Sequence, residues 1–356
     1  MRRAVPMLVL LMIGLASVVP DLAVGQTAGE LTVDELVARA LADNPDLKAA
    51  RIDVEASAAR VRQAGLRPNP MLELGGQKAI SPDNNLSIGV SLPLDLNGRK
   101  EGRIGVAERE LDTKRRQVAD RERRLRADVG MKAGEVLAAQ RSLRVIDDLL
   151  RVNRAGLAVV GNRVREGAAP ALDENLQVVE VNRLEASRHL GQGRVEIAAL
   201  QLKALVGMAP DAPLAVKGDL TPSPQTLNAA DAMQRAITDR ADVAVARAEV
   251  AMAAARAAER RVEFAVLTVQ QEVAAAFTQY EAAQRSLQLY ERGVRDVAGR
   301  NLGVVRQAYE LGRGSLLDVI AEQRRYIEIE NGYTDALKQV YDAAVDIERA
   351  VGVAGR

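Results

Sequence analysis

An internal repeat limits the folds open to this chain of 356 residues more than any other feature. The segment LTVDELVARALADNPDLKAARIDVEASAARVRQA (31–64) aligns without gaps with LNAADAMQRAITDRADVAVARAEVAMAAARAAER (227–260), at an offset of 196 positions. Charged residues keep their places, so that Arg51, for example, matches Arg247. The chain is therefore expected to contain the same helical unit twice.

A second alignment follows at a different offset, so the two copies differ in length. The hexapeptide AAQRSL occurs at 138–143 and again 144 positions later, and Gly167 matches Gly312 at an offset of 145. The second copy therefore lacks about 196 − 144 = 52 residues between its counterparts of Ala64 and Val118. The first copy carries a segment there that the second does not.

The unmatched segment contains the one clear β signal of the sequence. In NNLSIGVSLPLDLNGRK (84–100), apolar residues alternate with polar or small ones, and Asn97-Gly98 ends the run like a turn. Together with PMLELGGQK (70–78), this run predicts a β-hairpin over 69–95. The apolar positions of the two strands, which are candidates for membrane contact, are Leu72, Leu74, Leu86, Ile88, Val90, Leu92 and Leu94.

Almost all of the remaining chain is expected to be helical. A proline-free stretch predicts a helix over 99–165, about 100 Å long at 1.5 Å per residue, and a return helix follows over 171–206. Apolar residues recur along both at the 3.5-residue period of antiparallel helices that supercoil. Aromatic residues make up only 2% of the chain, which suits narrow helical seams better than a compact core. The expected fold is mainly α, with long antiparallel coiled-coil helical hairpins in two internal repeats and one short β-hairpin in the first repeat only.

These signals divide the chain into four parts. They are a signal peptide at 1–25, the first repeat at 26–206, a proline-rich linker at 207–226 and the second repeat at 227–352. In the second repeat, a helix is expected from 227 to about 311 with a soft break near Arg240, followed by a last helix to about 351. The stretch 255–273 has neither Gly nor Pro. One straight helix is therefore expected across the junction near 260–262, where the counterpart of the β-hairpin is missing.

The N-terminus predicts export from the cytoplasm. Arg2 and Arg3 precede an apolar stretch, and Ala23-Val24-Gly25 is a small-residue cleavage site. Cleavage there would leave a net charge of (49 − 2) − (48 − 1) = 0, so no basic excess indicates nucleic-acid binding. The chain has no Cys, which excludes disulfides, and no other apolar run approaches the roughly 18 residues of a membrane-spanning helix.

Catalytic chemistry is not visible in the sequence. His189 is the only histidine, and a lone His without Cys is far more often a surface or seam residue than a metal ligand. Carboxylates lie mostly three or four residues from Arg or Lys, where they stabilise helices. Neither a Ser-His-Asp set nor a Gly-rich phosphate loop is present. We therefore expect a protein that is not an enzyme and that has no cofactor and no metal site.

Two predicted turns between long helices share one pattern. VREGAAPALDE (164–174) and YELGRGSLLDV (309–319) both contain Gly-x-x-[Pro/Ser]-x-Leu-Asp. Turn geometry accounts for much of it, since glycine permits positive φ and Ser315 with Asp318 resembles a capping box. A matched docking surface at paired tips is the second interpretation, and both stay open. The residues concerned are Gly167, Pro170, Leu172, Asp173, Gly312, Gly314, Ser315, Leu317 and Asp318.

The order and spacing of these features resemble the TolC-type outer membrane efflux family, nearer its heavy-metal, CzcC-like branch. The resemblance is carried by LTVDELVARALADNPDLKAAR, LRPNPMLELGG, NNLSIGVSLPLDLNGRKEG and YELGRGSLLDVIAEQRRY. It implies a homotrimeric conduit in the outer membrane with a large periplasmic portion. It also implies that the tips meet a periplasmic adaptor protein and, through it, an inner-membrane pump of the RND type. Metal ions or small toxic compounds would pass through the conduit unchanged.

The sequence departs from the family pattern in its number of strands. The family pattern implies four strands from each protomer, whereas two are predicted here. Three protomers would then offer six strands, fewer than the eight of the usual smallest membrane barrel. Three interpretations stay open: a conduit subunit impaired by the loss of its second hairpin, a periplasmic coiled-coil scaffold that binds adaptors without forming a pore, and a subunit that shares a barrel with a full-length relative.

Overall fold

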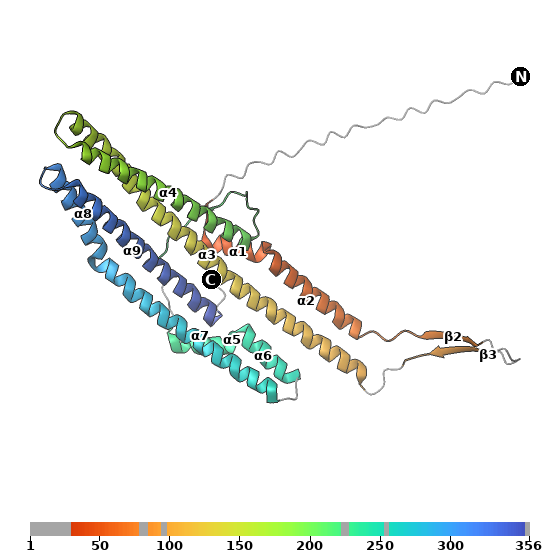
Figure 1. Ribbon diagram of the computed structural model, residues 1–356. Helices are drawn as coiled ribbons and strands as arrows, with labels where there is room; N and C mark the ends of the chain where they lie inside the picture. The colour runs from red at the N-terminus through yellow and green to blue at the C-terminus, as the bar shows by residue number, and fades with distance from the viewer. Residues whose placement is uncertain (1–29, 78–84, 94–97, 222–227, 253–255, 353–356) are drawn as a thin grey trace, which may run out of the picture.

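The computed structural model describes residues 30–77, 85–93, 98–221, 228–252 and 256–352. The predicted signal peptide and the side chain of Leu94 lie outside these ranges. Within them, two long helical hairpins lie side by side along the length of the molecule (Figure 1).

The first hairpin consists of two unbroken helices, α3 (Arg99–Arg165) and α4 (Ala171–Val206). In the second hairpin, α9 (Leu316–Val351) packs against a helix in three parts. These are α7 (Arg256–Leu289), the π-helical turn η1 (Tyr290–Val294) and α8 (Arg295–Glu310). Contacts between α3 and α9 join the two hairpins. The mainly α fold of long helical hairpins that the sequence predicts is confirmed.

Shorter elements cover the ends of the hairpins away from the tips. They are α1 (Val33–Asp43), α2 (Pro45–Ala64), α5 (Ala229–Asp239) and α6 (Ala241–Met252). The β-hairpin of β2 (Met71–Gln77) and β3 (Asn85–Ser91) connects α2 to α3, within the range predicted for it. A short parallel pair, β1 (Glu30–Leu31) with β4 (Ala215–Val216), ties the start of the described chain to the linker.

The two repeats use the same bond to attach their short helices to their long ones. Asn44 caps α2 by accepting from the N–H of Leu47 at 3.0 Å, and its Nδ2 donates to the carbonyl of Leu205 at 2.9 Å. Arg240 occupies the equivalent position between α5 and α6, and its Nη1 donates to the carbonyl of Ala350 at 3.2 Å. The offset of 196 relates the two donors and the offset of 145 relates the two acceptors. The repeat in sequence is therefore also a repeat in hydrogen bonding.

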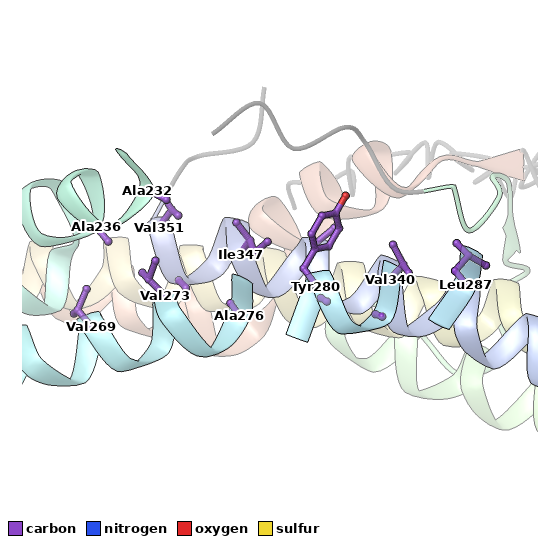
Figure 2. Packing of buried hydrophobic residues seen from close by; sticks show 14 of the residues in the cluster. Ala232, Ala236, Val269, Val273, Ala276, Tyr280, Leu287, Val340, Ile347 and Val351 are labelled. Atoms are coloured by element: carbon purple, nitrogen blue, oxygen red, sulfur yellow. The ribbon is translucent and has the colours of Figure 1, made fainter. Parts of the chain in front are cut away.

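Each repeat has its own large buried cluster, built mostly from small side chains. Figure 2 shows the cluster of the second repeat between α7 and α9, with Ala232 and Ala236 of α5 at one end. The cluster of the first repeat lies between α1, α3 and α4. Alanine and valine at these positions let helix axes approach closely, which explains how the chain packs with so few aromatic residues.

Helix α7 is unbroken across the junction near 260–262, as the sequence predicts, but the expected continuation of one helix from 241 into it is wrong. Helices α6 and α7 are packed together and antiparallel, because Arg240 at the start of α6 bonds to Glu272 far along α7 (Nη1 to Oε2, 2.5 Å). Val243 of α6 and Val269 of α7 also share the buried cluster. One straight helix would take Val243 out of this cluster, so tertiary packing overrides the local preference of the sequence.

As a result, a segment that aligns with α2 of the first repeat lies at the start of α7. Arg256 corresponds to Arg60 in α2 by the offset of 196, yet it is the first residue of α7. By the offset of 144 it corresponds to Asp112, which lies 13 residues after the start of α3 at Arg99. At 1.5 Å per residue the second repeat therefore ends about 20 Å short of the first. Figure 1 shows α2 and α3 extending beyond α6 and α7 at that end.

Candidate functional site at the helical tips and the strand hairpin

The two tips fold as the same backbone turn. In the first, the N–H of Gly167 donates to the carbonyl of Val164 at 3.0 Å, and the next N–H, of Ala168, reaches the carbonyl of Arg163 at 2.7 Å. In the second, Gly312 and Arg313 make the equivalent bonds at 2.9 and 2.8 Å. Gly167 and Gly312 have φ of 74° and 71°, a conformation that L side chains adopt at a cost. Turn geometry thus explains the glycine that the two turns share.

The helices that leave the two tips start differently. Ser315 caps α9 with a complete capping box, because its Oγ accepts from the N–H of Asp318 at 3.2 Å and Asp318 Oδ2 accepts from the Ser315 N–H at 3.2 Å. Pro170 stands at the same position before α4 and has no side-chain acceptor. The repeat-equivalent Asp173 is therefore not held in a capping box.

Asp173 makes a bond between the two tips instead. The hydroxyl of Tyr309, in the last turn of α8, donates to Asp173 Oδ2 at 3.3 Å. The guanidinium carbon of Arg163 lies 5.9 Å from the centre of the same ring. Partial burial, and then the neighbouring Asp173 carboxylate, raise the pKa of Tyr309, so the phenol stays protonated and able to donate. The structure thus brings the tips together through a residue pair that links both hairpins.

Most of the predicted tip residues point to solvent. Leu172 is 63% exposed and Leu317 is 58% exposed, although each belongs to a helix. Their neighbour Leu316 is buried beneath the second tip. The other exposed members of the predicted set are Gly167, Pro170, Gly312, Gly314, Ser315 and Asp318, while Asp173 is half-buried. The two leucines give the paired tips an apolar surface that turn geometry does not require.

Sequence reasoning missed Tyr309 and Arg163 as members of this site. Tyr309 lies within the quoted tip segment, and Arg163 lies one residue before the first tip segment. No spacing rule pairs either of them with a residue about 140 positions away. The only available signal was the presence of an aromatic residue at a tip in a chain that is 2% aromatic.

At the opposite end of the molecule, the strand hairpin has one apolar face. The register pairs Leu72 with Val90 and Leu74 with Ile88, and all four side chains are at least 65% exposed. The residues that alternate with them point to the other face and, apart from Met71, are small or polar. Leu86 lies in β3 opposite Gly76, and Leu92, which is 59% exposed, follows the strand. The pleat thus gives an apolar face and a polar face to a hairpin that no other described element covers.

Buried carboxylates join the hairpins between the tips and the short helices. Glu330 of α9, whose side chain is 2% exposed, accepts from Arg295 of α8 at 2.5 Å and from Arg141 of α3 at 3.2 Å. Nearer the tips, Glu180 of α4 accepts from Arg324 of α9 at 3.4 Å. Both carboxylates are compensated by guanidinium groups from another helix, as buried charges require.

In the part of the chain that the structure describes, no three His, Cys, Asp or Glu side chains gather as a metal ion would require. Its helices also include none that is both long and apolar enough to span a membrane.

Comparison with known proteins gives consistent matches. Residues 36–208 match the family described as "Outer membrane efflux protein". The chain is 23% identical over 382 aligned positions to the cobalt-zinc-cadmium resistance protein CzcC of Cupriavidus metallidurans, an alignment that covers 92% of this chain and 91% of that protein.

Solved structures match over most of the chain. The outer-membrane channel OprN superposes with a TM-score of 0.71 at 18% identity, covering 90% of this chain and 89% of the other. The open state of the Neisseria gonorrhoeae MtrE outer membrane channel gives 0.69 at 16% identity, with coverages of 90% and 88%. At this identity the structural matches establish the fold that the chains share.

Proposed function

We propose that this chain is a member of the outer membrane efflux protein family, which the match of residues 36–208 and its CzcC-like relative support, and that it is a conduit subunit of a tripartite efflux system. The conduit lies in the outer membrane and has a large periplasmic portion. The observation that carries the proposal is the pairing of the two tips at one end with an apolar strand hairpin at the other.

The arrangement of the helices supports assembly of identical subunits into a ring. The order α4, α3, α9, α8 leaves α4 and α8 at opposite edges (Figure 1). Both edges expose apolar residues at intervals of seven, as in Leu172 and Val179 on α4 and in Val297 and Val304 on α8, with Leu311 directly after α8. Two different edges that match each other form a head-to-tail interface, which gives a ring where the rotation between neighbouring subunits closes. The family pattern makes the ring a homotrimer.

We place the adaptor protein at the tips. The exposed Leu172 and Leu317 supply a small apolar surface at the same level on neighbouring hairpins, and such anchors carry much of the energy of protein docking. The remaining tip residues shape the turns, and the Tyr309–Asp173 bond holds the two tips together. Through the adaptor, an RND-type inner-membrane pump would deliver the substrate.

The substrate class rests on one relative. The similar protein of Cupriavidus metallidurans is named for cobalt, zinc and cadmium resistance, which favours metal ions over other small toxic compounds. Residues that would bind a metal along the conduit are not needed for this role, because substrate passes through without chemistry.

Loss of the second β-hairpin is proposed to impair conduction. The alignment with the CzcC relative has 382 positions, whereas 92% of 356 residues is about 328. The difference of about 54 positions is close to the 52 residues that the repeat offsets predict to be missing. Reading the gene in the source genome checks this directly, since an uninterrupted reading frame with about 52 additional codons near residue 260 would restore a normal conduit.

A periplasmic scaffold is the second candidate function, and the shortened second repeat favours it. Such a protein would keep both tips and occupy adaptors without forming a pore. Cell fractionation separates the two: a detergent-resistant oligomer in the outer membrane supports the conduit, whereas a soluble periplasmic protein supports the scaffold.

An export assay tests the conduit itself. The chain is expressed in a strain that has the adaptor and the pump but no other outer-membrane partner, and growth is followed in cobalt, zinc and cadmium salts. Partial resistance is expected, above that of the empty strain because conduction is impaired and not abolished, and it should fall when Leu172 and Leu317 are both changed to Arg. The matched control, Leu66→Arg, changes a similarly exposed leucine just after the end of α2 and should leave resistance unchanged.

A further inference from the structure

A groove lies between the two hairpins, apart from the tip residues and the strand hairpin. Its walls are α3 of the first hairpin and α8 of the second, and Tyr326 and Glu330 of α9 form its floor. The cavity measures about 440 Å³, a size that suits a small organic ligand. Its apolar lining consists of Val145, Leu149, Val152, Gly299 and Leu302.

Four arginines line this groove, two from each hairpin. They are Arg141 and Arg144 of α3 and Arg295 and Arg306 of α8. Arg141 and Arg295 share the buried carboxylate of Glu330, which accepts from them at 3.2 and 2.5 Å. Two of the four guanidinium groups are therefore held in place by a carboxylate on the floor of the groove.

The other two guanidinium groups have no carboxylate. Among the described residues, neither Arg144 nor Arg306 makes an ion pair or a hydrogen bond through its side chain. Arg144 has Asp147 and Asp148 within one turn of its own helix, but both carboxylates bond to other arginines. Asp148 is the one lining carboxylate besides that of the floor, and its side chain is 69% exposed at the rim. Four positive and two negative groups leave the groove with an excess of 4 − 2 = 2 positive charges, which attracts anions.

The two unpaired arginines do not belong to the helical scaffold that the repeats share. The counterpart of Arg144 is Gln288 by the offset of 144, and the counterpart of Arg306 is Gly161 by the offset of 145. Gly161 is buried, and a Cβ on it would lie 3.1 Å from Oε1 of Glu174. Packing of helical hairpins therefore requires an arginine at neither position. Each of the two is specific to its own wall of the groove.

The unpaired arginines stand at different levels of the groove. Arg141 and Arg295 mark one level, since both reach Glu330. Arg144 follows Arg141 by three residues and Arg306 follows Arg295 by eleven, and α3 and α8 both run toward the tips (Figure 1). At 1.5 Å per residue, Arg144 and Arg306 are about 12 Å apart along the groove. The apolar side chains of the lining occupy the levels between them.

We propose that this groove binds a linear organic dianion, with one acid group on Arg144, the other on Arg306 and an apolar chain between them. Arginine suits both ends, because its planar guanidinium makes two parallel bonds to a carboxylate. The chain of the ligand leaves water along Leu149 and Leu302. Two negative charges balance the excess of two positive charges. The site does not depend on the proposed function, because binding requires neither a ring nor a membrane.

Calorimetric titration of the purified full chain with octanedioate tests the site, at an ionic strength fixed by NaCl because salt screens exposed charges. Octanoate is the matched ligand, since it has the same chain length and one acid group. Octanedioate is expected to bind at one site and at least about tenfold more tightly, because a hydrogen bond to a charged group contributes that much. Equal affinities for the two acids would overturn the proposal.

Variants of the chain test the two ends separately. Arg144→Gln and Arg306→Gln should each weaken binding of octanedioate by about tenfold, to the affinity that the unchanged chain has for octanoate. The thermal midpoint should stay the same in both, since neither arginine has a partner to lose. The matched control is Arg154→Gln, which changes an exposed arginine of α3 that bonds to Glu185 outside the groove. Unchanged affinity in either groove variant, or an equal loss in the control, would contradict the assignment.

The length of the ligand gives a further test that needs no variant. Butanedioate has the same two charges but is too short to reach both arginines, so it should bind at least about tenfold more weakly than octanedioate. Equal binding of the two dianions would show that charge alone decides, and would refute a site with two ends. If octanedioate binds as expected and export of metal ions fails, the proposed function is wrong and the site stands.

Discussion

The two repeats differ at three kinds of place. The second lacks the strand hairpin, it has one extra residue near η1, and single residues at equivalent positions differ; elsewhere the repeats are alike. The backbone bonds of the two tips are the same, as are the bonds that attach the short helices to the long ones. The first repeat has a continuous α3 and a strand hairpin. The second has the π-turn η1 and two antiparallel helices, α6 and α7, that pack against each other. The two repeats thus share backbone geometry at the tips and at the attachment of the short helices. They differ in side chains and at the end of the molecule opposite the tips.

Side chains at equivalent positions of the two repeats also make different contacts. Asn44 and Arg240 donate to equivalent carbonyls, yet the first is a neutral cap and the second is a charged group 2% exposed. Asp318 belongs to a capping box, whereas Asp173 bonds to the other hairpin.

Replacing the two equivalent donors should have unequal effects. Burial opposes the charge of Arg240, but its bonds to Asp242 and Glu272 outweigh this and raise the pKa of the guanidinium. Arg240→Ala removes these bonds and should lower the free energy of unfolding by about 3 kcal/mol. Asn44→Ala removes a cap and should cost about 1 kcal/mol. Urea unfolding of the two variants measures the difference, and equal losses would show that the charge adds nothing.

The glycines that end α4 and α9 give a second unequal pair. Both have positive φ, but a Cβ on Gly207 would lie 2.7 Å from the backbone oxygen of Asp43, whereas on Gly352 it would lie 3.1 Å from Cγ of Arg240. A long side chain can move and a backbone carbonyl cannot. Gly352→Ala should therefore cost about 1–2 kcal/mol for its φ alone, and Gly207→Ala should cost more. The midpoints of thermal unfolding would rank them, and the reverse order would refute this explanation.

Exchanging the caps of the two tips should make them more alike. Pro170→Ser gives α4 the residue that caps α9, so Asp173 can complete a capping box and stabilise the helix by about 0.5–1 kcal/mol. The same change should draw Asp173 away from Tyr309 and weaken the bond between the tips. Tyr309→Phe is the control, since it removes that bond without adding a cap. A crystal structure of the Ser variant in which Tyr309 still bonds to Asp173 would contradict the expected exchange.

The smallest effect concerns charge at the end of α9. Glu348 takes the place that Lys203 has in the first repeat, and burial, followed by the Asp34 carboxylate, raises its pKa. A raised pKa means that this group favours folding below the pH at which the unfolded carboxyl titrates, and that the contribution is lost as the pH rises through the folded pKa. Glu348→Gln should therefore increase stability at pH 7 by a few tenths of a kcal/mol, reduced by partial exposure. The gain should vanish at pH 4, whereas Lys203→Gln should show no such pH dependence.

Much of the fold could be read from local sequence. The helical period, the proline-free stretch over 99–165 and the alternation within 84–100 each depend on residues near one another, so they survive without tertiary knowledge. The internal repeat further indicated that the two tips share one turn pattern. It also contained the change from 144 to 145, although only the structure located the extra residue in η1.

The rest could not be predicted because it depends on contacts between distant segments. Local preference favoured one helix from 241 onward, but Val243 and Val269 are buried together, so that α7 packs antiparallel to α6. The Tyr309–Asp173 bond likewise joins two hairpins that are separate in sequence.

The kinds of elements, their lengths and their duplication follow from local sequence, since helix and strand periods are set by neighbouring residues. Tertiary packing sets the antiparallel course of α6 and α7 and determines which equivalent side chains find a partner. Those choices follow from the burial of apolar faces and the compensation of buried charge, and both are properties of the packed chain.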